Sequence, residues 1–306
     1  MLHFLYCFDT NYTKQAFTSI FSILENVDKP VSIHIITDIK EEKIKVPGKV
    51  KNHVFIRELI FYKISNLEVD LYNLEEAHVT KATFYRLYLE DFLHMDEYVT
   101  YLDCDVICLK NPLNVLDEVS NELEINNKIV SFNTEILRGE GYSYFKDLSL
   151  MGDNYFNAGV MVFNASKWAK FDVKNKALKL IPKIQEKAIF WDQDILNIIF
   201  DKNFLELPDE LNSRLREEKL DTVFHHFSGK FKPWSINGVH QAFSENFHNY
   251  YKEIYSGSHL INVPNFKNGK KHLLKKIKDK EITNNIEGFL IIYASLKSII
   301  KKVIKS

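Results

Sequence analysis

The sequence holds little of what marks secreted, disordered or membrane-spanning chains. It has 3 cysteines, 7 prolines and 10 glycines in 306 residues. The cysteines show no paired spacing, so we expect no disulfide framework and no oxidising compartment. So few prolines and glycines argue against a long disordered linker. No apolar run reaches the roughly 18 residues of a membrane-spanning helix. The start, MLHFLYCFDT, is too short and too soon acidic for a signal peptide. We therefore expect a reduced, cytoplasmic protein.

Composition and charge define a globular body with a basic end. With 45% apolar and 26% charged residues, the chain can bury one large core and carry a small appendage. Residues 267–306 hold eleven lysines against three acids, a charge of +8, which leaves −9 on residues 1–266 of a chain whose net charge is −1. Because the basic residues are confined to one end, the pattern is not that of a nucleic-acid-binding protein. We expect a main domain over 1–266 and a helical basic tail over 267–306.

The tail has the pattern of an amphipathic helix. Apolar residues between Phe289 and Val303 recur at helical spacing, and Lys297, Lys301 and Lys305 form an opposite row four residues apart. Such a helix either packs on the body of the protein or lies in a membrane interface. Its broad apolar face and its basic charge favour the second interpretation, in which the tail holds the protein on an anionic inner membrane face.

Strand-like and helix-like segments alternate through the first hundred residues. This order predicts an α/β fold with a mixed, mostly parallel sheet flanked by helices. The expected strands are 2–8, 31–37, 54–59 and 98–103, and the expected helices are 14–26 and 80–92. The second half is more mixed, with strands at 158–164 and 222–227, helices near 166–170 and 192–200, and a helical end beyond Pro233. Ligands bind such sheets at the carboxyl ends of strands, where 9–11 and 103–105 are expected.

Asp103 and Asp105 close the strand-like run YVTYLDCD. Because side chains alternate along a strand, the two carboxylates point to the same side, whereas Cys104 points into the core. Two like charges held this close repel unless a cation lies between them. Carboxylate oxygens select hard cations such as Mg²⁺ or Mn²⁺. A solvated turn explains an isolated Asp-x-Asp equally well, so the pair needs partners elsewhere in the chain.

His226 is the candidate third ligand. It follows an expected strand, and an imidazole with two carboxylates suits Mn²⁺, although a lone histidine is more often structural. The adjacent His225 is expected to face the other way. In the loop that follows, Gly229 lets backbone N–H groups approach a phosphate and Lys232 adds positive charge.

Three further segments carry small or polar residues that suit a ligand. The triplet Asn157-Ala158-Gly159 opens a strand and leaves room against the backbone, unless it is only a tight turn. Asp192 and Gln193 begin a helix, where aspartate is a common cap, and they also place a carboxylate beside an amide in a potential sugar pocket. Arg86 is either a surface charge or a phosphate clamp.

Together these motifs resemble those of family 8 glycosyltransferases, which include bacterial lipopolysaccharide galactosyl- and glucosyltransferases and glycogenin. The resemblance spans about residues 1–235. The matching motifs follow the family's order: CFDTNY (7–12), ATFYRLYL (82–89), YLDCDVICLKNP (101–112), YFNAGVMVFN (155–164), WDQDILN (191–197) and HFSGKFKPW (226–234). The resemblance implies a GT-A catalytic domain with a Rossmann-like nucleotide-binding half. It also implies Mn²⁺ (or Mg²⁺) and transfer of a hexose from UDP-glucose or UDP-galactose with retention of configuration.

The resemblance also implies a role for each matching residue. The donor is expected to contact Asp9 and Asn11 at the uridine, Arg86 near the sugar and phosphates, Asp103 at the ribose or sugar, Asn157, Ala158 and Gly159 along the sugar, and Gly229 and Lys232 at the diphosphate. The implied metal ligands are Asp103, Asp105 and His226. Asp192 is expected to bond the sugar hydroxyls and Gln193 to lie beside the anomeric carbon, which makes these two the candidate catalytic residues.

The mechanism and two other function classes stay open from the sequence. Gln193 is a neutral amide and a poor nucleophile, which favours front-face attack over double displacement. A phosphatase of the haloacid-dehalogenase type also uses Asp-x-Asp and Mg²⁺, but near the chain start and with a later acidic motif that this chain lacks. A non-catalytic nucleotide-sugar or glycan-binding protein would not need the complete set of metal and phosphate residues. Leu211 stands where many relatives carry tryptophan, so the acceptor stays open among glycans, glycolipids and glycoproteins.

Overall fold

The protein is described by a computed structural model that covers residues 2–65, 67, 81–135, 148–151, 154–184, 187–229, 231–235, 238 and 241–256. The chain divides into two compact units, which are described separately below. The first comprises residues 1–213 and 221–226, and the second residues 214–220 and 227–306. The expected basic tail at 267–306 lies outside the described residues.

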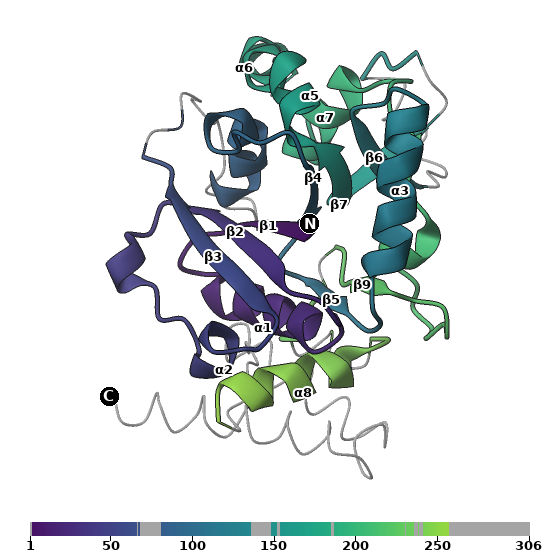
Figure 1. The fold of residues 1–306 in the computed structure, drawn as a ribbon. Helices are drawn as coiled ribbons and strands as arrows, with labels where there is room; N and C mark the ends of the chain where they lie inside the picture. The colour runs from purple at the N-terminus through teal and green to yellow at the C-terminus, as the bar shows by residue number, and fades with distance from the viewer. Residues whose placement is uncertain are drawn as a thin grey trace, which may run out of the picture. The chain divides into compact units, whose positions relative to one another are not determined.

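A seven-stranded sheet in the order β3-β2-β1-β4-β7-β6-β8 forms the centre of the first unit (Figure 1). Strands β1 (Leu2–Cys7), β2 (Val31–Thr37), β3 (Ile56–Lys63) and β4 (Tyr98–Leu102) are parallel. Strand β7 (Tyr155–Asn164) runs antiparallel to both β4 and β6 (Val130–Glu135), and the short β8 (Leu205–Glu206) is parallel to β6. The predicted mixed, mostly parallel sheet is therefore confirmed.

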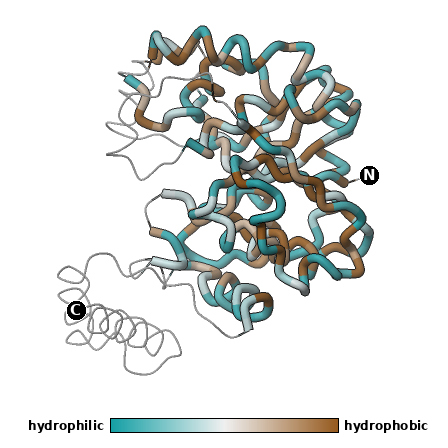
Figure 2. The backbone as a smooth tube through the Cα atoms, turned by 90° about the vertical axis from the view of Figure 1, so that its left-hand side faces the viewer, coloured by the Kyte–Doolittle hydropathy of each residue, from teal (hydrophilic) through white to brown (hydrophobic). Residues whose placement is uncertain are grey.

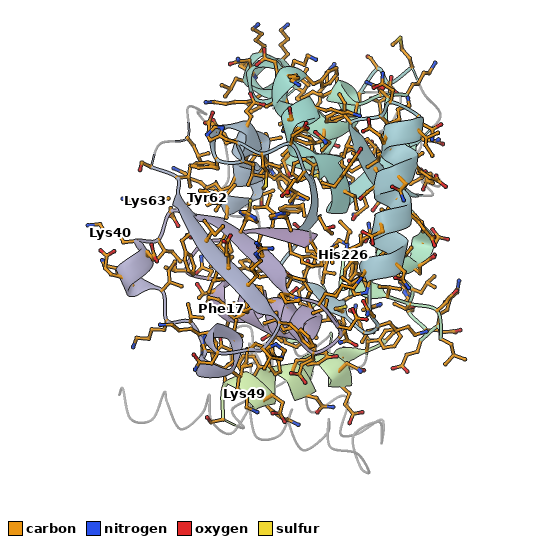
Figure 3. The ribbon with its side chains drawn as sticks, in the orientation of Figure 1. Phe17, Lys40, Lys49, Tyr62, Lys63 and His226 are labelled. Atoms are coloured by element: carbon orange, nitrogen blue, oxygen red, sulfur yellow. The ribbon has the colours of Figure 1, made fainter. Side chains whose placement is uncertain are left out.

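Alternating side chains of β1 pack against different layers on the two faces of the sheet. On one face lies α1 (Thr13–Leu24), where the Tyr6 and Ser19 hydroxyls hydrogen-bond at 2.9 Å and Phe17 meets Phe8 with ring centroids 6.1 Å apart (Figure 3). On the other face, Leu5 belongs to a core shared with η3 (Lys81–Asp91), α5 (Ala165–Lys170), α6 (Val173–Ile184) and α7 (Asp192–Ile199). Burial on both faces explains why most residues of β1 and β2 are apolar. Brown, hydrophobic stretches of the tube are visible in Figure 2.

The remaining elements are short or lie outside the large sheet. In the first unit these are η1 (Glu41–Lys43), α2 (Gly48–Lys51), α3 (Leu113–Ile125), η4 (Asp209–Leu211) and a two-stranded sheet of β5 (Val106–Cys108) and β9 (Phe224–His226). The second unit contains α8 (Ser244–Ile254), where Phe247 packs on Trp234 with ring centroids 5.2 Å apart. None of the described helices is long and apolar enough to cross a membrane.

One expected helix and one expected strand differ from the structure in ways that have a clear physical reason, and several other expected boundaries shift by a few residues. The segment expected as a helix over 80–92 is a 3-10 helix over Lys81–Asp91 with a non-helical residue at Tyr88. It buries side chains around its whole circumference, including Phe84 and Arg86, so packing rather than an amphipathic α-helical pattern sets its backbone. The strand expected at 54–59 begins at Ile56 and continues to Lys63, because β3 pairs with β2 as far as Thr37.

Candidate active site

The carboxyl end of β4 leads directly into the acidic pair. The Asp103 backbone N–H donates to the Gly159 carbonyl on β7 at 2.8 Å, and the chain then turns, with the Val106 N–H donating to the Asp103 carbonyl at 3.1 Å. The next strand, β5, pairs antiparallel with β9, in a register that sets Val106 opposite His226. This pairing brings His226, which lies far from the two aspartates in the sequence, beside them in the fold.

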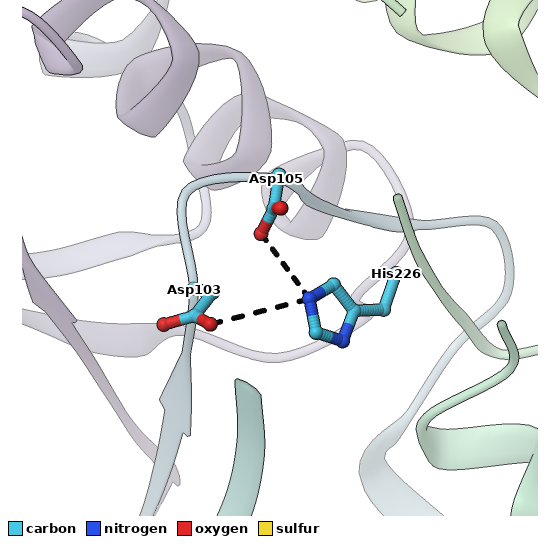
Figure 4. A group of neighbouring side chains, drawn as sticks. All are labelled: Asp103, Asp105 and His226. Atoms are coloured by element: carbon cyan, nitrogen blue, oxygen red, sulfur yellow. Dashed lines mark ion pairs between the residues drawn. The ribbon is translucent and has the colours of Figure 1, made fainter. Parts of the chain in front are cut away.

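Asp103, Asp105 and His226 form one cluster, in which a ligand atom from each residue lies within 4.8 Å of the others (Figure 4). His226 Nε2 lies 3.4 Å from Asp105 Oδ1 and 4.0 Å from Asp103 Oδ2. Asp105 and His226 are buried, so the carboxylate charge has little water to screen it. Two carboxylates and an imidazole nitrogen fit a hard divalent cation such as Mn²⁺ or Mg²⁺.

Gly159 provides the space in which this cluster forms. A Cβ atom at this position would lie 2.2 Å from His226 Cε1 and 2.9 Å from Asp103 Oδ2. Both distances are far shorter than ordinary van der Waals contact. The expectation that small residues here leave room for a ligand stays a prediction, because side chains of the cluster fill the space beside Gly159. The missing side chain of Gly159 makes room for two of the residues that would hold the metal.

Arg86 is a buried cation between two carboxylates, not a surface charge. Its guanidinium lies 3.0 Å from Asp103 Oδ1 and 2.7 Å from Asp192 Oδ2, and it donates to the Ala158 carbonyl at 2.5 Å. The guanidinium carbon also sits 4.7 Å from the centre of the Tyr101 ring. Burial acts to lower the pKa of Arg86, but the charges of Asp103 and Asp192 outweigh it and raise the pKa. Arg86 therefore stays protonated and links the metal cluster to α7.

Asp192 is the first residue of α7 and is almost completely buried. Burial raises its pKa to about 7, with a smaller contribution from the charge of Asp103, while Arg86 acts in the opposite direction. The preceding residue, Trp191, has φ 48°, a conformation that is strained for a residue with a bulky side chain. Backbone strain next to a buried carboxylate is typical of functional sites.

Gln193 is held against β7 through both ends of its amide. Its Oε1 accepts from the Ala158 N–H at 3.1 Å and from Asn157 Nδ2 at 3.2 Å. Its Nε2 donates to the Tyr155 hydroxyl at 3.1 Å, and that hydroxyl donates to Asp194 at 2.6 Å. The structure thus brings Asn157 and Ala158 into contact with Gln193, and their predicted contacts with a sugar stay a prediction.

Asp9 and Asn11 follow β1 and form a local turn. The Asn11 N–H donates to Asp9 Oδ1 at 2.8 Å, and the Asn11 side chain donates to Asp9 Oδ2 at 3.3 Å. Asn11 is exposed and Asp9 is half-buried, so both remain accessible to a ligand. As expected, they lie beyond the carboxyl end of a strand next to β4.

Gly229 and Lys232 belong to the second unit. Gly229 has φ 76°, a left-handed conformation that favours glycine, and a Cβ there would meet no atom within 4 Å. Lys232 Nζ donates to the Phe227 carbonyl at 2.8 Å, which holds the loop closed on itself. Their predicted contact with the diphosphate stays a prediction.

Several residues around the cluster escaped sequence analysis. Tyr101 donates to Asp103 at 2.6 Å, and its position two residues earlier on the same face of β4 could have indicated this. Asn212 contacts His226 Nδ1 at 3.0 Å. The Tyr155 hydroxyl accepts from Gln193 and donates to Asp194, so both residues help to hold the Gln193 amide. No local signal marks these three, since each acts through a contact between distant segments.

Cys104 and His225 lie where the alternation predicts. The Cys104 thiol points to the Cys7 carbonyl at 3.7 Å, and burial raises its pKa well above the ordinary value. His225 is buried, and burial lowers its pKa to about 4, with the neighbouring His226 as the second cause. Neither belongs to the three-residue metal cluster.

Comparison with known proteins identifies the family of the chain that carries these residues. The family model for glycosyl transferase family 8 matches residues 3–238. The chain belongs to glycosyltransferase family 8. As a member of this family with the Asp-Asp-His cluster, it is a hexosyltransferase, and the phosphatase and non-catalytic interpretations are set aside.

Relatives in bacteria include two lipopolysaccharide glycosyltransferases. The chain is 29% identical to the lipopolysaccharide 1,2-glucosyltransferase of Escherichia coli, covering 86% of this chain and 80% of that protein. It is 26% identical to the lipopolysaccharide 1,3-galactosyltransferase of Salmonella typhimurium, covering 77% and 73%, and 24% identical to general stress protein A of Bacillus subtilis, covering 81% and 92%.

Solved structures share the fold of this family 8 enzyme. The galactosyltransferase LgtC, in a complex with donor and acceptor sugar analogues, matches with a TM-score of 0.68 at 19% identity, over 88% of this chain and all of that one. The glycosyltransferase GlyE of Streptococcus pneumoniae matches with a TM-score of 0.59 at 20% identity, over 82% of this chain and 61% of that one. The fold is therefore GT-A, as the sequence predicts.

Proposed function

We propose that this enzyme transfers glucose or galactose from a UDP-sugar to a glycan, glycolipid or glycoprotein, with Mn²⁺ as cofactor and with retention of the anomeric configuration. The observation that supports this most is the position of the Asp103-Asp105-His226 cluster, which Arg86 joins to Asp192 through contacts of 3.0 and 2.7 Å. The residues that we propose for the cation and for the sugar thus lie on either side of one buried arginine. Such an arrangement suits a ligand that has a diphosphate at one end and a hexose at the other.

The proposed role of each residue follows from its charge. Asp103, Asp105 and His226 would hold Mn²⁺, which when bound supplies positive charge against the negative charge of the leaving diphosphate. Arg86 keeps Asp103 turned with one oxygen toward the guanidinium and the other toward the cluster. Asp192, ionised above a pKa of about 7, would accept hydrogen bonds from the sugar hydroxyls and stabilise an oxocarbenium-like sugar.

The hydrogen bonds of Gln193 favour front-face attack. Its Oε1 already accepts from the Ala158 N–H and from Asn157, so the amide oxygen is committed to two donors. A neutral amide is in any case a weak nucleophile. In the front-face route the acceptor hydroxyl attacks from the side of the departing diphosphate, and a diphosphate oxygen takes its proton.

The test is release of UDP from UDP-glucose and UDP-galactose by the purified full-length chain, with and without Mn²⁺. We expect Mn²⁺-dependent release that is lost in Asp105→Asn, and a product with the anomeric configuration of the donor. Release that is independent of any divalent cation would refute the metal assignment. A stable glycosyl adduct on a protein residue would refute front-face attack. The preferred sugar identifies the donor.

The resemblance further supports Gly229 and Lys232 as diphosphate contacts. We expect Lys232→Met to raise the KM for the UDP-sugar and to leave the Mn²⁺ affinity unchanged, since Lys232 would bind the phosphates and not the metal. Lys219, an exposed lysine in the same unit, supplies the matched control, Lys219→Met. Equal KM values for wild type and Lys232→Met would contradict the assignment.

The charge of the C-terminal segment supports a place at the inner face of the cell membrane. Residues 267–306 carry +8 and an amphipathic pattern, so the catalytic domain over 1–266 would be held peripherally at anionic lipid. We expect deletion of 268–306 to abolish binding to anionic vesicles and to preserve donor hydrolysis. The triple variant Lys297→Gln, Lys301→Gln and Lys305→Gln should bind more weakly without loss of chain length. Undiminished vesicle binding after the deletion would reject this location.

A further inference from the structure

A line of buried amide side chains connects β7 to His226. Asn157 Oδ1 accepts from Asn212 Nδ2 at 3.1 Å, and Asn212 Oδ1 lies 3.0 Å from His226 Nδ1. Asn157, Asn212 and His226 are all buried, at 6%, 2% and 4% exposure. A buried polar group without a partner is costly, so each amide must be turned to match its neighbour.

The backbone of β7 decides how each amide is turned. The Gly159 N–H can only donate, and it points to the Asn157 side chain at 3.0 Å, so the atom it meets must be the oxygen Oδ1. The Asn157 nitrogen then faces Gln193 Oε1, which is itself identified as an oxygen by the Ala158 N–H at 3.1 Å. Two independent backbone donors thus assign the same orientation to Asn157.

The orientation passes from Asn157 through Asn212 to the histidine ring. Because Asn157 offers an oxygen, Asn212 must present its nitrogen there and its oxygen to His226. An amide oxygen only accepts, so His226 Nδ1 must carry the proton. In the neutral ring the lone pair is then on Nε2, the atom that faces Asp105 and Asp103.

We infer that Asn212, oriented by Asn157, is a positioning residue that fixes His226 in its Nδ1–H tautomer and so leaves Nε2 available as a metal ligand. Without Asn212, the neutral ring is free to carry its proton on Nε2 and to donate it to Asp105, which would compete with a cation. Partners of this kind on metal-binding histidines typically change metal affinity by about 10–100-fold. The tautomer is a property of the metal-free protein, whereas the affinity effect rests on the proposed function.

The first measurement is the tautomer itself. Full-length protein labelled with ¹⁵N-histidine is examined by long-range ¹H–¹⁵N NMR without metal, at a pH where the ring is neutral, and the His226 signals are assigned by their loss in His226→Asn. We expect a protonated Nδ1 and an unprotonated Nε2 in the wild type. A protonated Nε2 would overturn the inference whatever the enzyme binds.

The second measurement is Mn²⁺ affinity, from the electron paramagnetic resonance signal of free Mn²⁺. In Asn212→Leu we expect a Kd about 10–100-fold weaker, together with loss of the Nδ1–H signal. Asn212→Asp keeps an acceptor for Nδ1 and should retain the tautomer, although it loses the donor to Asn157 Oδ1. Wild-type affinity in Asn212→Leu would overturn the inference.

A matched control separates this effect from general destabilisation. Asn164 is also buried, at 4% exposure, and lies at the other end of β7, where it caps α5 by accepting from the Lys167 N–H. Asn164→Leu should lower the urea midpoint of unfolding through loss of the cap and leave the tautomer and the Kd unchanged. If the wild type binds no Mn²⁺, the proposed metal role fails, while the NMR result still decides the inference.

Discussion

A methyl group at position 159 would occupy space that the metal cluster now fills. In Gly159→Ala the new Cβ would lie 2.2 Å from His226 Cε1, 2.8 Å from His226 Nδ1 and 2.9 Å from Asp103 Oδ2. Carbon atoms in contact are normally about 3.5–4.0 Å apart. The imidazole must therefore move by roughly 1 Å or more, or β7 must shift away from β4. The first movement pulls His226 Nε2 from its place beside Asp105, and the second breaks the hydrogen bond from the Asp103 N–H to the Gly159 carbonyl.

The expected cost falls more heavily on metal binding than on folding. Overpacking a core position costs about 1–3 kcal/mol of stability, which a chain of this size can absorb. Metal affinity is expected to fall by at least about 10-fold, because the displaced ring also loses its bond to Asn212. The assay compares the Kd for Mn²⁺ with the urea midpoint of unfolding, and UDP release from the donor should fall in parallel with metal occupancy.

Two other glycines serve as controls for this substitution. A Cβ at Gly48 would meet no atom within 4 Å, so Gly48→Ala should leave both the Kd and the stability near wild type. At Gly229, the proposed diphosphate contact, the space is also open but φ is 76°, so the urea midpoint of Gly229→Ala, and not its UDP release, reports backbone strain without crowding. Gly159→Ala with a wild-type Kd and wild-type UDP release would refute the placement of His226 against β7.

Three further predictions concern buried charges. Arg86→Leu leaves Asp103 and Asp192 without the cation between them and should destabilise the protein by roughly 3–5 kcal/mol in urea unfolding, whereas Arg86→Leu with Asp192→Asn should recover part of that loss. Asp192→Asn alone should lower kcat by about 100-fold or more at an unchanged Kd for Mn²⁺, since Asp192 lies outside the metal cluster; an equal loss of metal affinity would contradict its role. Burial, and then the neighbouring His3, lower the pKa of His34 to about 4. Because the unfolded state takes up this proton near pH 6.5, stability should fall by about 2 kcal/mol between pH 7.5 and pH 5 and continue to fall toward pH 4. His34→Gln should flatten that part of the curve of urea midpoint against pH, and an unchanged slope would exclude His34 as its source.

Sequence patterns predicted the sheet better than they predicted its surroundings. The run 31–37 is β2 without any change of boundary, because a strand buried on both faces is rich in β-branched apolar residues, which can be recognised without knowledge of its partners. The segment around Arg86 was expected as a helix and is a kinked 3-10 helix, since its conformation depends on packing against α5 and α6. Patterns of one segment carry no information about such neighbours.

In the candidate site, too, local patterns predicted some residues and missed those that depend on contacts with distant segments. Asp103 and Asp105 could be predicted as a pair because they follow a buried strand two residues apart, although the structure places them in the turn between β4 and β5 and not on the strand. Cys104 faces the core as expected. Asn212 could not be singled out, because its part depends on a hydrogen bond to His226 from another segment. Arg86 was left undecided between surface and pocket, and only its burial between two carboxylates answers that question.

The sequence by itself determined the family, the α/β architecture and the position of the acidic pair just after β4, since these follow from ordered motifs and local periodicity. The sequence offered His226 as a third ligand, and the tertiary structure decided that this histidine reaches the aspartates, because β5 leaves the large sheet and pairs with β9. The tertiary structure also decided how the amides of Asn157 and Gln193 are turned, because only the backbone N–H groups of β7 distinguish oxygen from nitrogen there. The period of a strand is a local property of the chain. The partners and the orientation of a side chain in the site depend on segments that meet only when the chain folds.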